Sequence, residues 1–170
     1  MIEIKDKADV KFSEQAMTEI QRIMSHYPAE RKKSALLPVL HVAQAEFGGW
    51  VSPAVMDKVA EILEIQPIEV YEVATFYTMF NLKPVGKHVL EVCRTGPCCL
   101  RGADQIIDMI KNKLNIAEGE TSADGMFTLK PVECLAACGT GPVIQVRETY
   151  YENIDSEEAL DKFLNDLRNS

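Results

Sequence analysis

"HVLEVCRTGPCCLRGADQII", residues 88–107, joins a β-rich run to a turn with three cysteines and to the start of a helix. "MFTLKPVECLAACGTGP", residues 126–142, again places cysteines directly after an alternating, strand-like run. Between them, residues 103–114 predict a helix with Ile106, Ile107 and Ile110 turned inward. The order is strand, helix, strand, which predicts a βαβ unit. Pro131 favours an edge position or a bulge for the second strand.

A βαβ unit brings the cysteines of the two stretches together. Strands joined by such a crossover run parallel, so their carboxyl ends emerge at the same edge of the sheet. Ligands commonly bind at this edge in α/β sheets. We therefore expect Cys93 and Cys98 of the first loop to converge with Cys134 and Cys138 of the second.

The spacing of these thiols indicates which ligand they hold. The pairs are C-x4-C and C-x3-C, whereas structural zinc usually takes tight C-x2-C turns and a thioredoxin-like disulfide takes C-x-x-C. Wider gaps suit a cluster with two irons. Nearby glycines allow backbone N–H groups to approach sulfur. Arg94 and Arg101 either offset the negative charge of a cluster or are ordinary solvated side chains. The remaining alternative is four buried, unliganded thiols.

The rest of the second half predicts a hairpin and a last helix. "PVIQV" and "TYYEN" form the hairpin around residues 147–149. Asp155, with Glu158 three residues later, predicts the cap of a helix that buries leucines and Phe163. The predicted order after residue 86 is therefore β-α-β-β-β-α, with a four-stranded mixed sheet.

The first half has the periodicity of helices. Ser13 predicts one N-cap, and Ser52 followed by Pro53 predicts another. A helix between them carries Pro38 in its first turn, and Pro67 begins a further helix whose predicted face runs on to Tyr77 and Phe80. Pro84 and Gly86 in "NLKPVGK" mark the boundary. We expect a helical region over residues 1–82 and a second domain over residues 87–170.

Composition limits the classes of function. The chain has 170 residues and a formal net charge of −8, which disfavours nucleic acid as a partner because phosphate binding needs a basic face. "MIEIKDKADV" lacks the features of a signal peptide, and no apolar run is long enough for a membrane span. We expect a soluble, intracellular chain, peripheral to a membrane at most, whose thiols are reduced.

These motifs carry a resemblance to a known family. "CRTGPCCLRGADQII" followed by "GMFTLKPVECLAACGTGPVIQV" resembles the thioredoxin-like 2Fe–2S subunit (the E-type or 24 kDa-type subunit) of NADH:quinone oxidoreductase, the respiratory complex I. "KKSALLPVLHVAQAEFGGWVSPAVMDKVAEIL" and "PIEVYEVATFYTMF" are similar to the family's N-terminal helical region, and "LNIAEGETSADGMFTL" to its loop before the second pair of cysteines. The resemblance covers about residues 13 to 168.

The resemblance implies a thioredoxin-like fold with one 2Fe–2S cluster held by Cys93, Cys98, Cys134 and Cys138. It further implies an electron-transfer subunit that exchanges single electrons with the FMN of a partner flavoprotein, on which NADH is oxidised, within a larger cytoplasmic complex peripheral to the inner membrane. Related subunits occur in soluble NAD-linked hydrogenases and formate dehydrogenases. This chain has no phosphate-binding glycine loop for NADH or FMN, and no catalytic residues are assigned.

Two groups of residues have alternative interpretations, and the first of these depends on the resemblance. The four-residue gap selects Cys98 as a ligand, so we expect Cys99 to point elsewhere, most simply into the core, although a C-x5-C reading with Cys99 is an alternative. Phe76, Tyr77 and Phe80 are interpreted as core residues or, with Trp50, as a docking surface for the flavoprotein. A self-standing thioredoxin-like ferredoxin and a zinc-stabilised interaction module are the alternative functions.

Overall fold

The computed structural model describes residues 9–169, which divide into two compact units, one up to residue 84 and the other from residue 85. The expected absence of a signal peptide falls mostly on residues 1–8, which lie outside the described range, as does residue 170.

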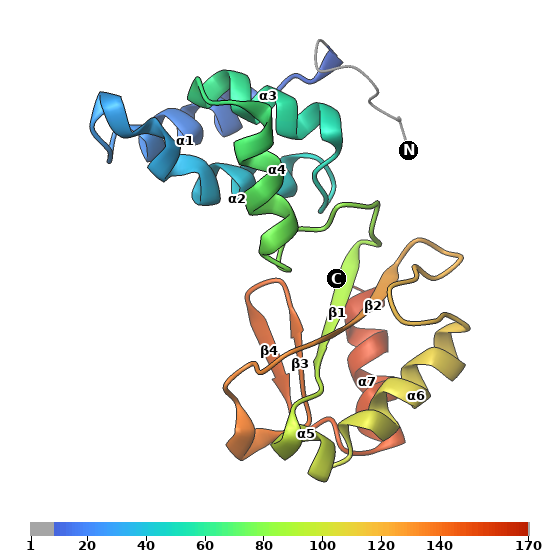
Figure 1. The fold of residues 1–170 in the computed structure, drawn as a ribbon. Coiled ribbons are helices and arrows are strands. Elements are labelled where there is room, and N and C mark those ends of the chain that lie inside the picture. Colours follow the sequence, from blue (N-terminus) through green and yellow to red (C-terminus); the bar gives the residue numbers. More distant parts are fainter. Residues whose placement is uncertain (1–8, 170) are drawn as a thin grey trace. The chain divides into compact units, whose positions relative to one another are not determined.

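The N-terminal unit is built from helices (Figure 1), two of which have a serine as N-cap. Ser13 Oγ accepts the N–H of Ala16 at 3.2 Å, and Ser52 Oγ accepts the N–H of Val55 at 3.2 Å, so both predicted N-caps are confirmed. Their inner faces pack into a core centred on side chains such as Leu40. The α-helices are α1 (Glu14–Met24), α2 (Leu36–Glu46), α3 (Pro53–Leu63) and α4 (Pro67–Phe76), with a 3-10 helix (Ala29–Ala35) before α2.

Helix α4 is shorter than its apolar pattern predicts. It ends at Phe76, because Tyr77 takes extended backbone angles (φ −90°, ψ 109°). The prediction that Tyr77 and Phe80 extend the buried face of this helix is therefore wrong, although Phe80 is buried from the segment that follows. The side chain of Phe76 is 76% exposed. An apolar stripe at helical spacing thus continues past the point where the helix itself stops.

The C-terminal unit contains a four-stranded sheet in the order β2-β1-β3-β4. β1 and β2 are parallel, and the pairs β1–β3 and β3–β4 are antiparallel. Helices α6 and α7 pack against the sheet and enclose its core (Figure 1). This arrangement confirms the predicted mixed sheet and α/β class. The elements are β1 (His88–Cys93), α5 (Gly96–Leu100), α6 (Ala103–Leu114), β2 (Phe127–Val132), a 3-10 helix (Cys138–Thr140), β3 (Val143–Val146), β4 (Thr149–Glu152) and α7 (Glu157–Arg168).

β2 lies at one edge of the sheet, which confirms the position expected from Pro131. The loop before β2 folds back along the outer side of this strand. Gly119 N–H donates to Leu129 O at 2.7 Å, and Leu129 N–H donates to Glu120 O at 3.2 Å. Ser122 N–H donates to the carbonyl of Phe127 at 2.8 Å. The first half of the edge strand is therefore paired on both sides.

One local prediction is wrong, and one element was not predicted. The cap of α7 is Ser156, whose Oγ accepts the N–H of Ala159 at 3.2 Å, and not Asp155. A serine one residue later offers the same kind of acceptor, so spacing alone does not separate the two. The short helix α5 has no counterpart among the predicted elements, because five residues are too few for a periodic pattern.

Candidate iron–sulfur site at the sheet edge

The first cysteine loop is a compact turn at the carboxyl end of β1. Cys93 is the last residue of the strand, and Thr95 is the N-cap of α5, in which Cys98 lies. The side chains of Cys93 and Cys98 are buried and hydrogen-bonded to each other. Thr95 Oγ1 lies 3.3 Å from Cys93 Sγ. The fold alone therefore positions this pair of thiols.

Backbone N–H groups point at these two sulfurs and shape their ionisation. Burial raises the pKa of Cys93, but the Thr95 hydroxyl, the N–H groups of Thr95 and Leu135, and Cys98 stabilise its thiolate, so the net pKa is lowered. Burial and the neighbouring Cys93 raise the pKa of Cys98 to about 11, against a hydrogen bond from Val143 N–H. The pair thus shares one proton more readily than it holds two charges.

The second cysteine loop leaves β2 beside the first. β1 and β2 pair as far as Cys93 and Val132, and Arg94 N–H extends this ladder to Val132 O at 3.0 Å. Cys134 follows two residues later and is exposed; its Sγ accepts the N–H of Ala136 at 3.3 Å. Cys138 begins a 3-10 helix, is also exposed, and is close enough to raise the pKa of Cys98 by its charge.

The structure thus brings three of the four predicted thiols near one another and leaves Cys134 turned toward its own loop. Within residues 9–169, no group of three or more Cys, His, Asp or Glu side chains is arranged as a finished metal site. The donor set nevertheless fits a 2Fe–2S cluster: four thiols lie on loops from one sheet edge, and N–H groups already point at three of the sulfurs.

Cys99 does not lie in the core as predicted. It is half-buried, and its Sγ donates to Arg94 O at 3.2 Å and to Asp104 Oδ1 at 3.7 Å. α5 turns successive side chains by about 100°, which directs Cys98 inward and Cys99 toward the backbone of the preceding turn. The expectation that Cys99 points away from Cys98 agrees with this placement.

Thr95 and Gly141 make contacts at the site that the sequence did not predict. Thr95 supplies both its hydroxyl and its N–H to Cys93. Gly141 is packed so tightly that a Cβ on it would lie 3.1 Å from Cys98 Sγ and 3.8 Å from Arg101 Cδ. No sequence pattern predicts that a loop glycine or threonine contacts a particular cysteine, so these contacts are found only in the folded structure.

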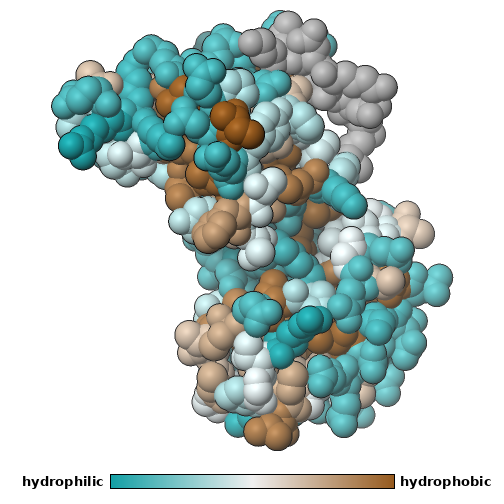
Figure 2. Space-filling view, viewed as in Figure 1, coloured by the Kyte–Doolittle hydropathy of each residue, from teal (hydrophilic) through white to brown (hydrophobic). Residues whose placement is uncertain are grey.

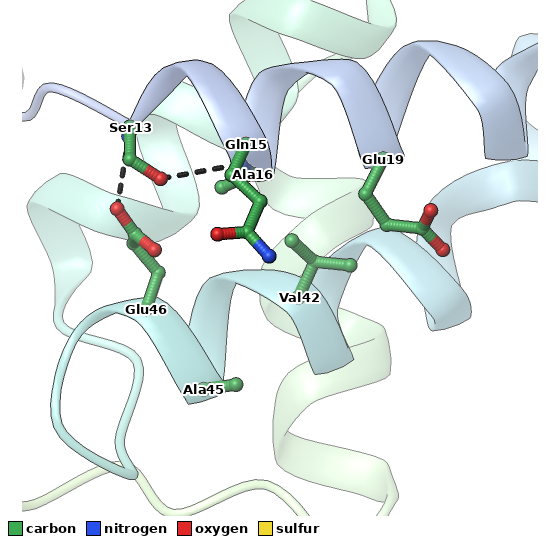
Figure 3. Close-up of a pocket in the computed structure, with 7 residues that line it drawn as sticks. All are labelled: Ser13, Gln15, Ala16, Glu19, Val42, Ala45 and Glu46. Atoms are coloured by element: carbon green, nitrogen blue, oxygen red, sulfur yellow. Dashed lines mark hydrogen bonds between the residues drawn. The ribbon is translucent and has the colours of Figure 1, made fainter.

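A separate hollow of about 330 Å³ lies between α1 and α2 in the N-terminal unit (Figure 3). Ser13 N–H donates to Glu46 Oε1 at 2.9 Å at one end of it. Its lining offers carboxylates and small side chains but no thiol. The residues drawn in Figure 3 are Ser13, Gln15, Ala16, Glu19, Val42, Ala45 and Glu46.

A βαβ unit whose strand ends present four cysteines defines the class of thioredoxin-like proteins that carry an iron–sulfur centre. The sequence matches the family described as thioredoxin-like 2Fe-2S ferredoxin over residues 20–168. The chain belongs to this family.

Relatives match along most of the chain. It is 42% identical over 160 residues to the E-type subunit of NADH-quinone oxidoreductase from Rickettsia prowazekii (strain Madrid E), covering 92% of this chain and 90% of the relative. It is 42% identical over 159 residues to the mitochondrial NADH dehydrogenase (ubiquinone) flavoprotein 2 of Dictyostelium discoideum, covering 94% of this chain and 64% of that protein.

The fold is also similar to a solved structure. It matches a chain in the crystal structure of an NAD+-reducing NiFe-hydrogenase in the air-oxidised state with a TM-score of 0.67 and 15% sequence identity. The match covers 78% of this chain and 22% of the hydrogenase chain, so this chain spans about a fifth of that protein's length.

In residues 9–169, no helix is both long and apolar enough to cross a membrane.

Proposed function

We propose that this chain is the electron-transfer subunit of an NADH dehydrogenase complex, with one 2Fe–2S cluster held by Cys93, Cys98, Cys134 and Cys138. The observation that carries the proposal is the buried, hydrogen-bonded pair Cys93–Cys98 beside a second cysteine loop at the same sheet edge. The names of the relatives support the type of complex, since one of them is a subunit of an NADH-quinone oxidoreductase.

When bound, the cluster supplies a site that takes up and releases one electron at a time. The chain's own residues hold it and set its surroundings. Burial of Cys93 and Cys98 keeps water from their side of the site, and N–H groups of Thr95, Leu135 and Val143 donate to their sulfurs. Such donors stabilise the additional negative charge of the reduced state. The exposed second loop leaves one side of the site open to a partner.

Anaerobic reconstitution of the full chain with iron and sulfide tests the cluster. We expect two irons and two sulfides per chain, visible absorbance from sulfur-to-iron charge transfer, and an electron paramagnetic resonance signal after reduction. A colourless protein with one bound zinc would contradict the proposal and support the zinc-stabilised interaction module.

The proposed partner is a flavoprotein that binds FMN and oxidises NADH. An apolar surface on and after α4 supports docking: Ile68 is 61% exposed, Phe76 76% and Met79 41%. Exposed large apolar side chains gathered on one segment are typical of interaction sites. Leu100, 91% exposed beside the thiols in α5, offers a second apolar contact, and Figure 2 shows hydrophobic surface at the tip of the C-terminal unit, where Figure 1 places α5.

NADH and the purified flavoprotein of an NADH:quinone oxidoreductase test the partnership. We expect NADH to reduce the reconstituted cluster only when that flavoprotein is present. Phe76→Ser should weaken the complex about tenfold, whereas Tyr150→Ser, which changes an exposed aromatic residue of β4, should not. Reduction by NADH without the flavoprotein would contradict the assignment of FMN and NADH to the partner.

The fold match to an NAD+-reducing hydrogenase supports a second candidate assembly, a soluble NAD-linked hydrogenase. The family resemblance adds a formate dehydrogenase as a further alternative. Purifying the tagged chain from its own cells and identifying its partners decides between the assemblies. We expect the other components of complex I in a fraction bound to the cytoplasmic face of the inner membrane. Recovery with components of a hydrogenase or formate dehydrogenase would contradict that placement.

A further inference from the structure

We propose that Arg101 is a positioning residue that ties the two cysteine loops together and places a fixed positive charge beside the thiols. The inference rests on the proposed cluster for its electrostatic part. The tie between the loops is a property of the chain itself and is testable without iron.

The backbone of Arg101 is fixed to the first loop. Arg101 is the C-cap of α5, and its N–H donates to Cys98 O at 3.1 Å. The next residue, Gly102, has φ +97°, a conformation that glycine adopts without strain. Arg101 is therefore held between the end of α5 and the glycine that precedes α6.

The side chain of Arg101 reaches the second loop. Its Nη1 donates to Gly139 O at 3.3 Å, across 38 residues of sequence. Its Cδ lies 3.8 Å from the position of a Cβ on Gly141, a position that Cys98 Sγ also approaches at 3.1 Å. Arg101 thus bonds Gly139, the residue directly after Cys138, and lies beside Gly141. Holding this stretch against Cys98 holds Cys138 near the buried pair.

The two arginines of the first loop differ in their charged neighbours. Arg94 Nη1 lies 3.4 Å from Glu118 Oε2, with both side chains about half exposed, whereas within residues 9–169 no ion pair joins Arg101 to a carboxylate. Four thiolates, two ferric ions and two sulfides carry a net negative charge that grows on reduction. A guanidinium, which stays protonated throughout the physiological range, stabilises the reduced form more than the oxidised form. Arg101 therefore raises the reduction potential.

Three full-length variants separate these effects: Arg101→Gln, Arg101→Lys and, as the matched control, Arg94→Gln. In the iron-free chain, hydrogen exchange reports how firmly residues 134–141 are held. We expect exchange there about tenfold faster in Arg101→Gln, the factor that corresponds to about 1.4 kcal/mol for a hydrogen bond from a charged donor, and unchanged exchange in Arg94→Gln.

In the reconstituted chain, a redox titration followed by electron paramagnetic resonance reports the potential, and transfer of iron to a chelator reports retention. We expect a lower potential and faster iron loss in Arg101→Gln. Arg101→Lys should restore the potential, because it keeps the charge, and should restore slow exchange only in part, because the shorter reach of the ammonium changes the contact.

Exchange in Arg101→Gln equal to that of the unmodified chain, or an equal change in Arg94→Gln, would overturn the tie. An unchanged potential in Arg101→Gln would overturn the electrostatic role. If the unmodified chain takes up no iron, the proposed function fails, and exchange in the iron-free variants still decides whether Arg101 joins the loops.

Discussion

The two cysteine loops differ in how completely the polypeptide alone builds them. In the first loop, Cys93 and Cys98 are buried, contact each other and receive hydrogen bonds from the backbone. In the second, Cys134 and Cys138 are exposed. The difference follows from local structure: one loop is a strand end joined to a helix, the other the run between β2 and β3 with one 3-10 turn. The fold therefore positions the thiols of the first loop without iron, and we call this loop the prepared half of the site. The second loop supplies the other two thiols.

The largest effect is expected from removing one thiol of the prepared half. Cys98→Ser should abolish the visible absorbance of the reconstituted chain, because a buried inward ligand is lost, while Cys99→Ser should retain it, because Cys99 contacts Arg94 O and Asp104. Absorbance and iron content after anaerobic reconstitution provide the measurement. Loss of the cluster in Cys99→Ser together with its retention in Cys98→Ser would establish the C-x5-C reading instead.

Alkylation of the iron-free chain compares the loops directly. We expect Cys134 and Cys138 to react with iodoacetamide at least about tenfold faster than Cys93 and Cys98, since burial requires local opening before reaction. Peptide mass spectrometry gives the rate for each thiol. Bound iron should protect all four thiols from alkylation and leave the rate for Cys99 unchanged. Equal rates for the four thiols without iron would show that the first half is not prepared.

Glycines in the second loop test how closely the halves fit. Gly141→Ala places a methyl group 3.1 Å from Cys98 Sγ, whereas Gly139→Ala meets no atom within 4 Å. Overpacking of this kind costs about 1–3 kcal/mol, so Gly141→Ala should lose iron to a chelator faster than the unmodified chain, and Gly139→Ala should not. Equal iron retention in the two variants would mean that Cys98 moves freely and that its position is not prepared.

The smallest expected effect concerns the sheet under both loops. His88, at the opposite end of β1 from Cys93, is buried, and its Nε2 lacks a hydrogen bond. Burial, with the charges of Lys87 and Arg147, lowers the pKa of His88. The folded state therefore binds the proton less well than the unfolded state. The contribution of neutral His88 to the free energy of unfolding is therefore complete above the ordinary pKa of about 6.5 and is lost as the pH falls below that value.

Urea unfolding at pH 7.5 and 5.5 measures this term. The free energy of unfolding should decrease from pH 7.5 to pH 5.5 in the unmodified chain. In His88→Leu this decrease should be smaller, by less than about 1.4 kcal/mol. His26→Leu, which changes an exposed histidine, is the control and should keep the full decrease. An identical decrease in His88→Leu would show that this histidine does not couple the sheet to pH.

The strand and helix order of the C-terminal unit was predictable because its signals are local: β-rich runs end at cysteines, and Ile106, Ile107 and Ile110 mark the inner face of one helix. The convergence of the loops followed from the rule for parallel strands. The orientation of individual thiols did not follow, because it depends on α5, which is too short to show a period, and on contacts such as Gly141 with Cys98. The prediction of where α4 ends was wrong for a related reason, since apolar residues that face outward cannot be told by sequence from those that face the core.

The loop that pairs with β2 also limits how this protein assembles. With Gly119, Glu120 and Ser122 already bonded to that strand and Pro131 lacking an N–H further along it, this side of the sheet offers a foreign chain few groups for strand addition. A neighbouring protein on this side must therefore recognise side chains rather than extend the sheet. Self-association into continuous β-structure is disfavoured there for the same reason. A free copy of the chain is therefore protected against polymerising along that edge.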